Sequence, residues 1–188
     1  MGYGSIGREV ARLLQPFGCK VLAAKRDVMH PEDHEYTIDG HGDPEGIYFH
    51  RLYPIEALHS MLKECDFVVV TLPLTPQTQG IIGETAFKNF KPGAYLVHVS
   101  RGGVVDENAL LEALVEKRLA GAAVDVFTQE PLPPASPLWK APNLILTPHV
   151  SGFSPQYKER AGQMFAENLK RYLHAEPLLN EYRHFRHY

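Results

Sequence analysis

Three polar residues of different chemistry each come shortly after an apolar, strand-like segment: Arg101, Glu130 and His149. A guanidinium binds anions, a carboxylate can orient an imidazole, and an imidazole can exchange protons near neutral pH. If the segments before them are parallel strands of one sheet, their carboxyl ends share an edge, where ligands bind in open α/β sheets. The three residues would then converge on one crevice. Taken singly, such an Arg is usually a surface charge and such a His is usually structural.

A glycine-rich segment at the start of the chain predicts dinucleotide binding. Gly2-Tyr3-Gly4-Ser5-Ile6-Gly7 is a G-x-G-x-x-G that opens a helix. Gly2 permits a tight turn, Gly4 lets backbone approach a pyrophosphate, and Gly7 lets the helix and sheet pack closely. We therefore expect Gly4, Ser5, Ile6 and Gly7 to contact the cofactor. The motif alone is weak, because its confirmation requires a preceding strand and only Met1 precedes it.

The next strand ends with two basic residues, Lys25 and Arg26. In an NAD-specific site an acidic residue at this position binds the ribose hydroxyls. Lys and Arg instead attract a 2′-phosphate, so we favour NADP over NAD as the cofactor. Asp27 lies one or two positions late and leaves NAD open, and both basic residues could also be ordinary solvated charges.

The elements that must position these residues alternate along the chain. Helices are expected over 6–17, from Pro54, over 106–117 and over 155–173. Strands are expected at 20–24, 67–72, 95–99, 122–127 and 144–146, whereas residues 27–53 are expected to form a long irregular segment. This alternation indicates βαβ units. The fold class is therefore α/β, with a doubly wound parallel sheet of the Rossmann type.

Composition excludes several other classes of protein. The 188 residues carry 19 basic and 22 acidic side chains, a net charge of −3, which gives no general attraction to nucleic acid or to a membrane surface. No apolar run approaches the ~20 residues of a membrane helix. Cys19 and Cys65 indicate reduced thiols, in or near the core of a cytoplasmic protein. His30 and His34 have a metal-ligand spacing, but Pro31 argues against a helix there, so no metal site is predicted.

The ordered motifs make the chain similar to the D-isomer-specific 2-hydroxyacid dehydrogenases. The resemblance covers nearly all of residues 2–180 and includes Ser100-Arg101-Gly102-Gly103 and Leu72-Pro73-Leu74-Thr75-Pro76. It implies hydride transfer between a nicotinamide cofactor and a small 2-oxo or 2-hydroxy acid. Arg101 would bind the substrate carboxylate, and His149 would be the acid/base. Glu130 would hydrogen-bond the other imidazole nitrogen and fix the tautomer.

The resemblance also implies a wider cofactor cleft and an assembly. Asp125 would lie near the nicotinamide carboxamide. The remaining expected cofactor-binding residues line the cleft, partly through backbone groups: Leu72, Pro73, Thr78, Val99, Ser100 and Gly152. A homodimer is expected by the same resemblance. Neither the individual 2-hydroxy acid nor the direction of the reaction follows from the sequence.

Three departures from the family pattern qualify these expectations. The strand that feeds the glycine loop is missing, and so is most of the substrate domain, so we expect an incomplete form with weak or no activity alone. Residues 1–152 form the cofactor domain, and 153–188 form a helix and tail that return to the missing domain. His98 stands where the family usually has Asn. Alternatives are a non-catalytic dinucleotide-binding module and a remnant that folds only with another chain.

Overall fold

The computed structural model describes residues 1–33 and 35–182. Its strands are all parallel and form two ladders. The larger ladder has the order β3-β4-β5-β6, and β1 pairs with β2 in the smaller one. The strands are β1 (Leu22–Lys25), β2 (Arg51–Pro54), β3 (Phe67–Val70), β4 (Ala94–His98), β5 (Leu119–Val124) and β6 (Leu144–Leu146). The carboxyl ends of β3–β6 therefore lie along one edge, as the predicted Rossmann-type sheet requires.

The first two residues of the chain connect the two ladders at this edge. The Met1 nitrogen donates to the Val69 carbonyl at 2.7 Å, and the Thr71 N–H donates to the Met1 carbonyl at 2.9 Å. On the other side, the Gly2 N–H donates to the Ala24 carbonyl at 3.0 Å. Met1 and Gly2 thus occupy the end of a strand position between β1 and β3. The expected missing strand is absent from the described residues, but the carboxyl ends of its neighbours still have backbone partners.

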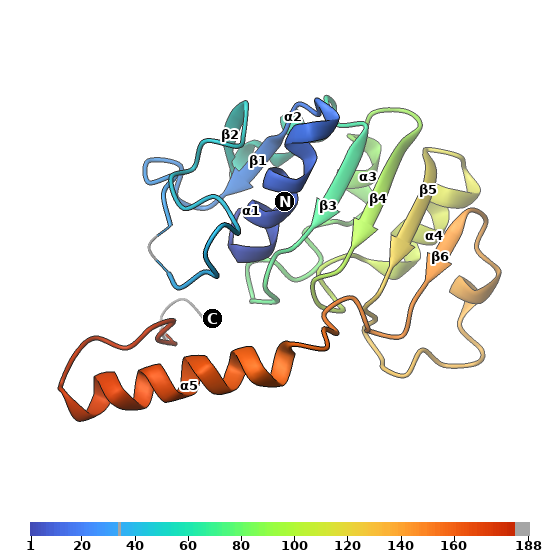
Figure 1. Ribbon diagram of the computed structural model, residues 1–188. Coiled ribbons are helices and arrows are strands. Elements are labelled where there is room, and N and C mark those ends of the chain that lie inside the picture. The colour runs from blue at the N-terminus through green and yellow to red at the C-terminus, as the bar shows by residue number, and fades with distance from the viewer. Residues whose placement is uncertain (34, 183–188) are drawn as a thin grey trace.

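Short helices cover one face of the larger ladder. α2 (Leu58–Leu62), α3 (Glu84–Lys88) and α4 (Glu107–Val115) pack behind the sheet in the view of Figure 1, and their apolar side chains share one core with β3, β4 and β5. Side chains alternate between sheet faces, so the opposite face carries Phe67, Tyr95 and Ile145, which are 67%, 44% and 66% exposed. Phe67 and Tyr95 stack with their ring centroids 5.2 Å apart.

α1 (Ser5–Leu14) lies on this second side, next to β1 (Figure 1). A 3₁₀ turn over Gln15–Phe17 follows it and ends at Gly18, whose φ of 67° suits glycine. The buried residues of α1 are Arg8 and Ala11, whereas the apolar Ile6 and Leu13 remain more than half exposed. The helix is therefore formed as its apolar spacing predicts, but that spacing does not identify the buried face.

The last helix, α5 (Tyr157–Leu173), runs below the carboxyl ends of the strands and back beneath α1 in Figure 1. None of its residues, all of which are described, is buried. The segment after it returns to the body of the molecule, where the Tyr36 N–H donates to the Asn180 side chain at 2.9 Å. No helix within residues 1–33 and 35–182 is long and apolar enough to cross a membrane.

Three local expectations need correction. Residues 27–53 are not irregular throughout, because Arg51–Pro54 forms strand β2 beside β1. The helix expected from Pro54 begins instead as a 3₁₀ turn over Ile55–Ala57 and becomes α2 afterwards. Cys19 is exposed rather than near the core, because it follows the left-handed Gly18 at the end of the helical segment; Cys65 is half-buried.

Candidate active site at the carboxyl edge of the sheet

Glu130 and His149 meet at the carboxyl edge of the sheet, on the loops that follow β5 and β6. Glu130 Oε2 lies 2.7 Å from His149 Nδ1, and both side chains remain partly exposed. An ionised carboxylate only accepts hydrogen bonds, so Nδ1 carries the hydrogen of this contact. That assignment leaves Nε2 as the nitrogen that can exchange a proton with a ligand.

Arg101 follows β4 at the same edge, and its side chain is exposed. Its Nη1 donates to the Ser100 carbonyl at 2.7 Å. The next residue, Gly102, packs directly on the loop that carries Glu130, since a Cβ atom there would lie 1.8 Å from the Phe127 carbonyl oxygen. The loops that carry Arg101 and Glu130 are therefore in backbone contact, and the three predicted residues share one edge.

Two hydrogen bonds fix the Glu130 carboxylate in its ionised form. The bond with His149 has the larger effect on the pKa of Glu130. The second bond is donated by the Phe127 N–H to Oε1 at 3.0 Å. Both lower the pKa of Glu130 below its ordinary value, because both stabilise the charged carboxylate. Glu130 therefore stays an acceptor across the neutral pH range and holds the imidazole in one orientation.

Asp125 lies buried at the end of β5 and binds the loop that contains His149. Its Oδ1 accepts from the Thr147 hydroxyl and from the Val150 N–H at 2.9 Å, and its Oδ2 accepts from the Ser151 N–H at 2.9 Å. Burial raises the pKa of Asp125, but the bonds from Ser151, Thr147 and Val150 together lower it below the ordinary value. The Asp125 carboxylate thus holds the loop that contains His149. Contact with a nicotinamide carboxamide stays a prediction.

The glycine loop has the geometry of a phosphate cradle. Gly2 has a φ of 86°, and a Cβ on Gly7 would lie 2.1 Å from the Gly2 carbonyl oxygen. A Cβ on Gly4 would meet nothing within 4 Å, so the backbone there faces open space. Gly4 is the N-cap of α1, and no described side chain caps that helix. The first N–H groups of α1, including those of Ser5 and Ile6, are thus available to an anion, and the loop fits a dinucleotide pyrophosphate.

The two basic residues after β1 differ in their surroundings. Lys25 is half-buried, and its Nζ donates to the His30 carbonyl at 2.6 Å. Burial lowers the pKa of Lys25 below its ordinary value. Arg26 is exposed at the end of the strand. Asp27 pairs with His30 Nδ1 at 2.8 Å, which orders the turn that follows. Lys25 therefore supports the loop, and contact of Arg26 with a 2′-phosphate stays a prediction.

The remaining predicted cleft residues lie on the loops after β3 and β4. Leu72 is buried, and the Thr78 hydroxyl donates to the Pro73 carbonyl at 2.5 Å, which closes the 73–78 loop on itself. Val99 and Ser100 continue β4 towards Arg101. Gly152 is exposed beyond His149, and a Cβ there would meet nothing within 4 Å. Their contact with a cofactor stays a prediction.

His98 is buried beneath the turn that carries Arg101. Its Nδ1 lies 3.2 Å from the Ser100 hydroxyl. Burial lowers the pKa of His98 to about 4, against a hydrogen bond with the Arg101 backbone that raises it. The ring is therefore neutral at neutral pH and serves as a polar support for residues 100–101.

Sequence reasoning did not identify the residue that anchors the 27–53 segment. Arg8, in the first turns of α1, is fully buried and donates to the carbonyls of Asp43 and Pro31 at 2.5 Å each. Its Nε lies 3.1 Å from the Asp33 carboxylate, and its guanidinium lies over the Tyr3 ring, 4.7 Å from the centroid. The sequence does not signal this role, because Arg8 lies opposite the apolar face that Ile6, Val10 and Leu13 would form on a helix. Arg8 ties the long segment to the helix of the glycine loop.

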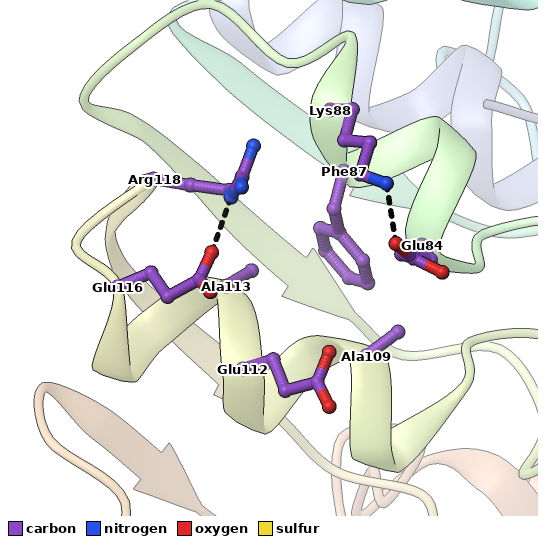
Figure 2. A pocket seen from close by; sticks show the side chains of 8 residues that line it. All are labelled: Glu84, Phe87, Lys88, Ala109, Glu112, Ala113, Glu116 and Arg118. Atoms are coloured by element: carbon purple, nitrogen blue, oxygen red, sulfur yellow. Dashed lines mark hydrogen bonds and ion pairs between the residues drawn. The ribbon is translucent and has the colours of Figure 1, made fainter.

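A hollow between α3 and α4 lies away from this edge. Figure 2 shows that it is lined by charged side chains, with ion pairs between Glu84 and Lys88 and between Glu116 and Arg118. Arg118 directly precedes β5 and so belongs to the amino edge of the sheet. Among the residues that the structure describes, which do not include His34, no group of three or more His, Cys, Asp or Glu side chains could hold a metal ion.

Comparisons with known proteins show that the chain is similar to one family of dehydrogenases. Residues 1–151 match the family profile "D-isomer specific 2-hydroxyacid dehydrogenase, NAD binding domain". The chain is 41% identical over 169 residues to a glyoxylate reductase of Korarchaeum cryptofilum, covering 90% of this chain and 46% of that protein. The chain therefore spans about half the length of this relative.

Solved structures show the same similarity. A D-isomer specific 2-hydroxyacid dehydrogenase from Xanthobacter autotrophicus Py2, in complex with NADPH and MES, has a TM-score of 0.84 and 34% identity, covering 100% of this chain and 70% of that one. An NADPH-dependent glyoxylate/hydroxypyruvate reductase from Sinorhizobium meliloti, in complex with NADP and sulfate, has a TM-score of 0.77 and 33% identity, covering 95% of this chain and 52% of that one.

Proposed function

Because the chain belongs to the D-isomer specific 2-hydroxyacid dehydrogenase family, through its NAD-binding domain, we propose that it takes part in hydride transfer between a nicotinamide cofactor and a 2-oxo or 2-hydroxy acid. The observation that carries the proposal is the 2.7 Å contact between Glu130 and His149, on neighbouring strand ends. A carboxylate-oriented imidazole on the same sheet edge as an exposed guanidinium suits reduction of a carbonyl next to a carboxylate.

In the direction of reduction, Arg101 binds the substrate carboxylate through its planar guanidinium and so orients the adjacent carbonyl. When bound, a reduced nicotinamide would supply the hydride that the carbonyl carbon receives. His149 donates the proton on Nε2 to the carbonyl oxygen, and Glu130 stabilises the ring through Nδ1 throughout. In the direction of oxidation, the neutral Nε2 takes the proton from the hydroxyl. Proton transfer of this kind contributes roughly 100- to 10,000-fold to a rate.

The cofactor is held, in this proposal, by the open Gly4 backbone and the first turn of α1, with Arg26 beside the ribose. NADP is favoured over NAD because Arg26 attracts a 2′-phosphate. The relative from Sinorhizobium meliloti is described as NADPH-dependent and supports the same preference. A homodimer and a cytoplasmic location complete the proposal by family resemblance.

Cofactor binding and turnover can be tested separately on the 188-residue chain. Calorimetric titration with NADPH and NADH measures binding, and the absorbance of the reduced nicotinamide with glyoxylate or hydroxypyruvate measures turnover. His149→Ala should keep cofactor binding and lower turnover at least about 100-fold. His59→Ala, at an exposed histidine of α2, is the matched control and should leave both unchanged. Because the incomplete form is expected to have weak or no activity alone, absence of turnover does not select the non-catalytic module. Turnover unaffected by His149→Ala contradicts the proposed acid/base, and failure to bind either cofactor contradicts the proposed function.

A further inference from the structure

Glu107 makes a contact that helix capping does not explain. It is the first residue of α4 and is half-buried, and its Oε1 accepts the Thr128 N–H at 2.6 Å, across 21 residues of sequence. The N-cap of α4 is the preceding residue, Asp106, which accepts the N–H groups of Asn108 and Ala109. The helix end is therefore already capped, and the Glu107 carboxylate is directed to another loop.

That loop carries Glu130. The N–H groups of two successive residues bind two different carboxylates: Phe127 donates to Glu130 Oε1 at 3.0 Å, and Thr128 donates to Glu107 Oε1. Gly102 packs against the same backbone, because a Cβ added to it would lie 1.8 Å from the Phe127 carbonyl oxygen. The backbone at 127–128 is thus held from α4, from the Arg101 loop and by Glu130 itself.

We infer that Glu107 is a positioning residue, which holds the 127–130 loop so that Glu130 keeps its second oxygen for His149. An unpaired Thr128 N–H would be an open donor two residues from the Glu130 carboxylate, and charged acceptors form strong bonds with backbone N–H groups. By occupying that donor, Glu107 prevents it from competing with the imidazole. This inference rests on the proposed function, in which Glu130 orients His149 as the acid/base. The contacts that carry it are made within this chain.

The test is ¹⁵N NMR of the His149 imidazole in the full chain at neutral pH, because the shifts of the two ring nitrogens report which of them carries the hydrogen. His149→Ala assigns its signals, and Glu130→Ala defines the shifts of a ring without the carboxylate contact. Glu107→Ala should move the His149 shifts part of the way towards those of Glu130→Ala, because the Thr128 N–H then competes for the Glu130 carboxylate. Glu107→Gln, which keeps an oxygen acceptor for the Thr128 N–H, should keep the shifts near their original values. Glu112→Ala, at an exposed residue of the same helix, should leave them unchanged.

Unchanged His149 shifts in Glu107→Ala, while Glu130→Ala moves them, overturn the inference. If Glu107→Ala does not fold by circular dichroism, the folded Glu107→Gln variant decides: shifts like those of Glu130→Ala overturn the inference, and shifts near the original support it. The measurement needs no cofactor or substrate. Failure to bind either cofactor, or turnover unaffected by His149→Ala, therefore contradicts the proposed function without deciding the role of Glu107.

Discussion

The Asp125 carboxylate holds the two peptide N–H groups that follow His149, whose own backbone is left-handed with a φ of 57°. A non-glycine residue in this region costs roughly 1–3 kcal/mol unless its surroundings hold it there. Asp125 supplies that support from the end of β5, where it is buried. The position of the imidazole thus depends on a buried carboxylate of the neighbouring strand as well as on its contact with Glu130.

Replacement of Asp125 by Asn should lower the free energy of unfolding by roughly 1–3 kcal/mol, since one of its oxygen acceptors becomes an NH₂ group that faces an N–H or hydroxyl donor. Denaturant titration at pH 7 measures this loss. The pKa of Asp125 is lowered in the folded state, so its stabilisation is complete above pH about 4 and is lost as the pH falls below that value. Asp39→Asn, at an exposed loop residue, is the control, and equal unfolding midpoints for the two variants would contradict the role of Asp125.

Gly102→Ala tests the backbone contact between the Arg101 loop and the Glu130 loop. The added Cβ would lie 1.8 Å from the Phe127 carbonyl oxygen, so the two loops must separate. We expect a loss of about 1–3 kcal/mol in the free energy of unfolding, measured by thermal or denaturant melting. Gly162→Ala, in α5, where a Cβ meets nothing within 4 Å, should keep or raise stability. A Gly102→Ala protein as stable as Gly162→Ala would show that the loops are not in close contact.

Most elements of the fold can be predicted from local sequence signals. β6 has the predicted bounds, Leu144–Leu146, and Asp106 caps α4 as its residue type suggests. Strand β2 could not be predicted, because Arg51–Pro54 is short and polar at its start and is a strand only by pairing with β1. The apolar spacing of α1 predicts a helix but not its buried face, which is determined by the packing of Arg8 against the 27–53 segment.

The candidate site is also only partly predictable from the sequence. Arg101, Glu130 and His149 can be predicted to share an edge, because parallel strands end together. The supporting contacts of Asp125 and Glu107 could not be predicted, because each joins loops that are more than 20 residues apart in the sequence. The hydrogen bond from Lys25 to the His30 carbonyl could not be predicted either, because in the sequence Lys25 and its exposed neighbour Arg26 are two similar basic residues.

Two glycines of the cofactor loop should respond differently to Ala. At Gly7 the Cβ would lie 2.1 Å from the Gly2 oxygen, so Gly7→Ala should lower the free energy of unfolding by about 1–3 kcal/mol. At Gly4 the Cβ meets open space, so Gly4→Ala should leave stability within about 0.5 kcal/mol of the original. It should nevertheless weaken NADPH binding roughly tenfold, because the methyl group occupies the space of the pyrophosphate. Calorimetry and melting on the same samples measure both effects, and unaltered NADPH binding by Gly4→Ala would contradict the cradle.

His98 should make stability depend on pH in the mildly acidic range. Its folded pKa of about 4 lies below the ordinary value of 6.5, so the unfolded chain binds the extra proton between these values. Its contribution is complete above pH about 6.5, and roughly 3 kcal/mol is lost as the pH falls to about 4. Asn has a similar hydrogen-bonding capacity and does not titrate. His98→Asn should therefore flatten this part of the curve in denaturant titrations from pH 4 to pH 7, and parallel curves for the two proteins would contradict a buried neutral ring.

Cofactor preference should depend on Arg26 more than on Lys25. Arg26 is exposed beside the predicted ribose site, and a guanidinium bond to phosphate is worth about 1.5–3 kcal/mol. Arg26→Ala should therefore weaken NADPH binding roughly 10- to 100-fold and leave NADH binding unchanged, as measured by calorimetry. Lys25→Ala should instead lower the free energy of unfolding, because Nζ holds the His30 carbonyl at 2.6 Å, and should affect both cofactors alike. Equal weakening of NADPH and NADH by Arg26→Ala would contradict the preference for NADP.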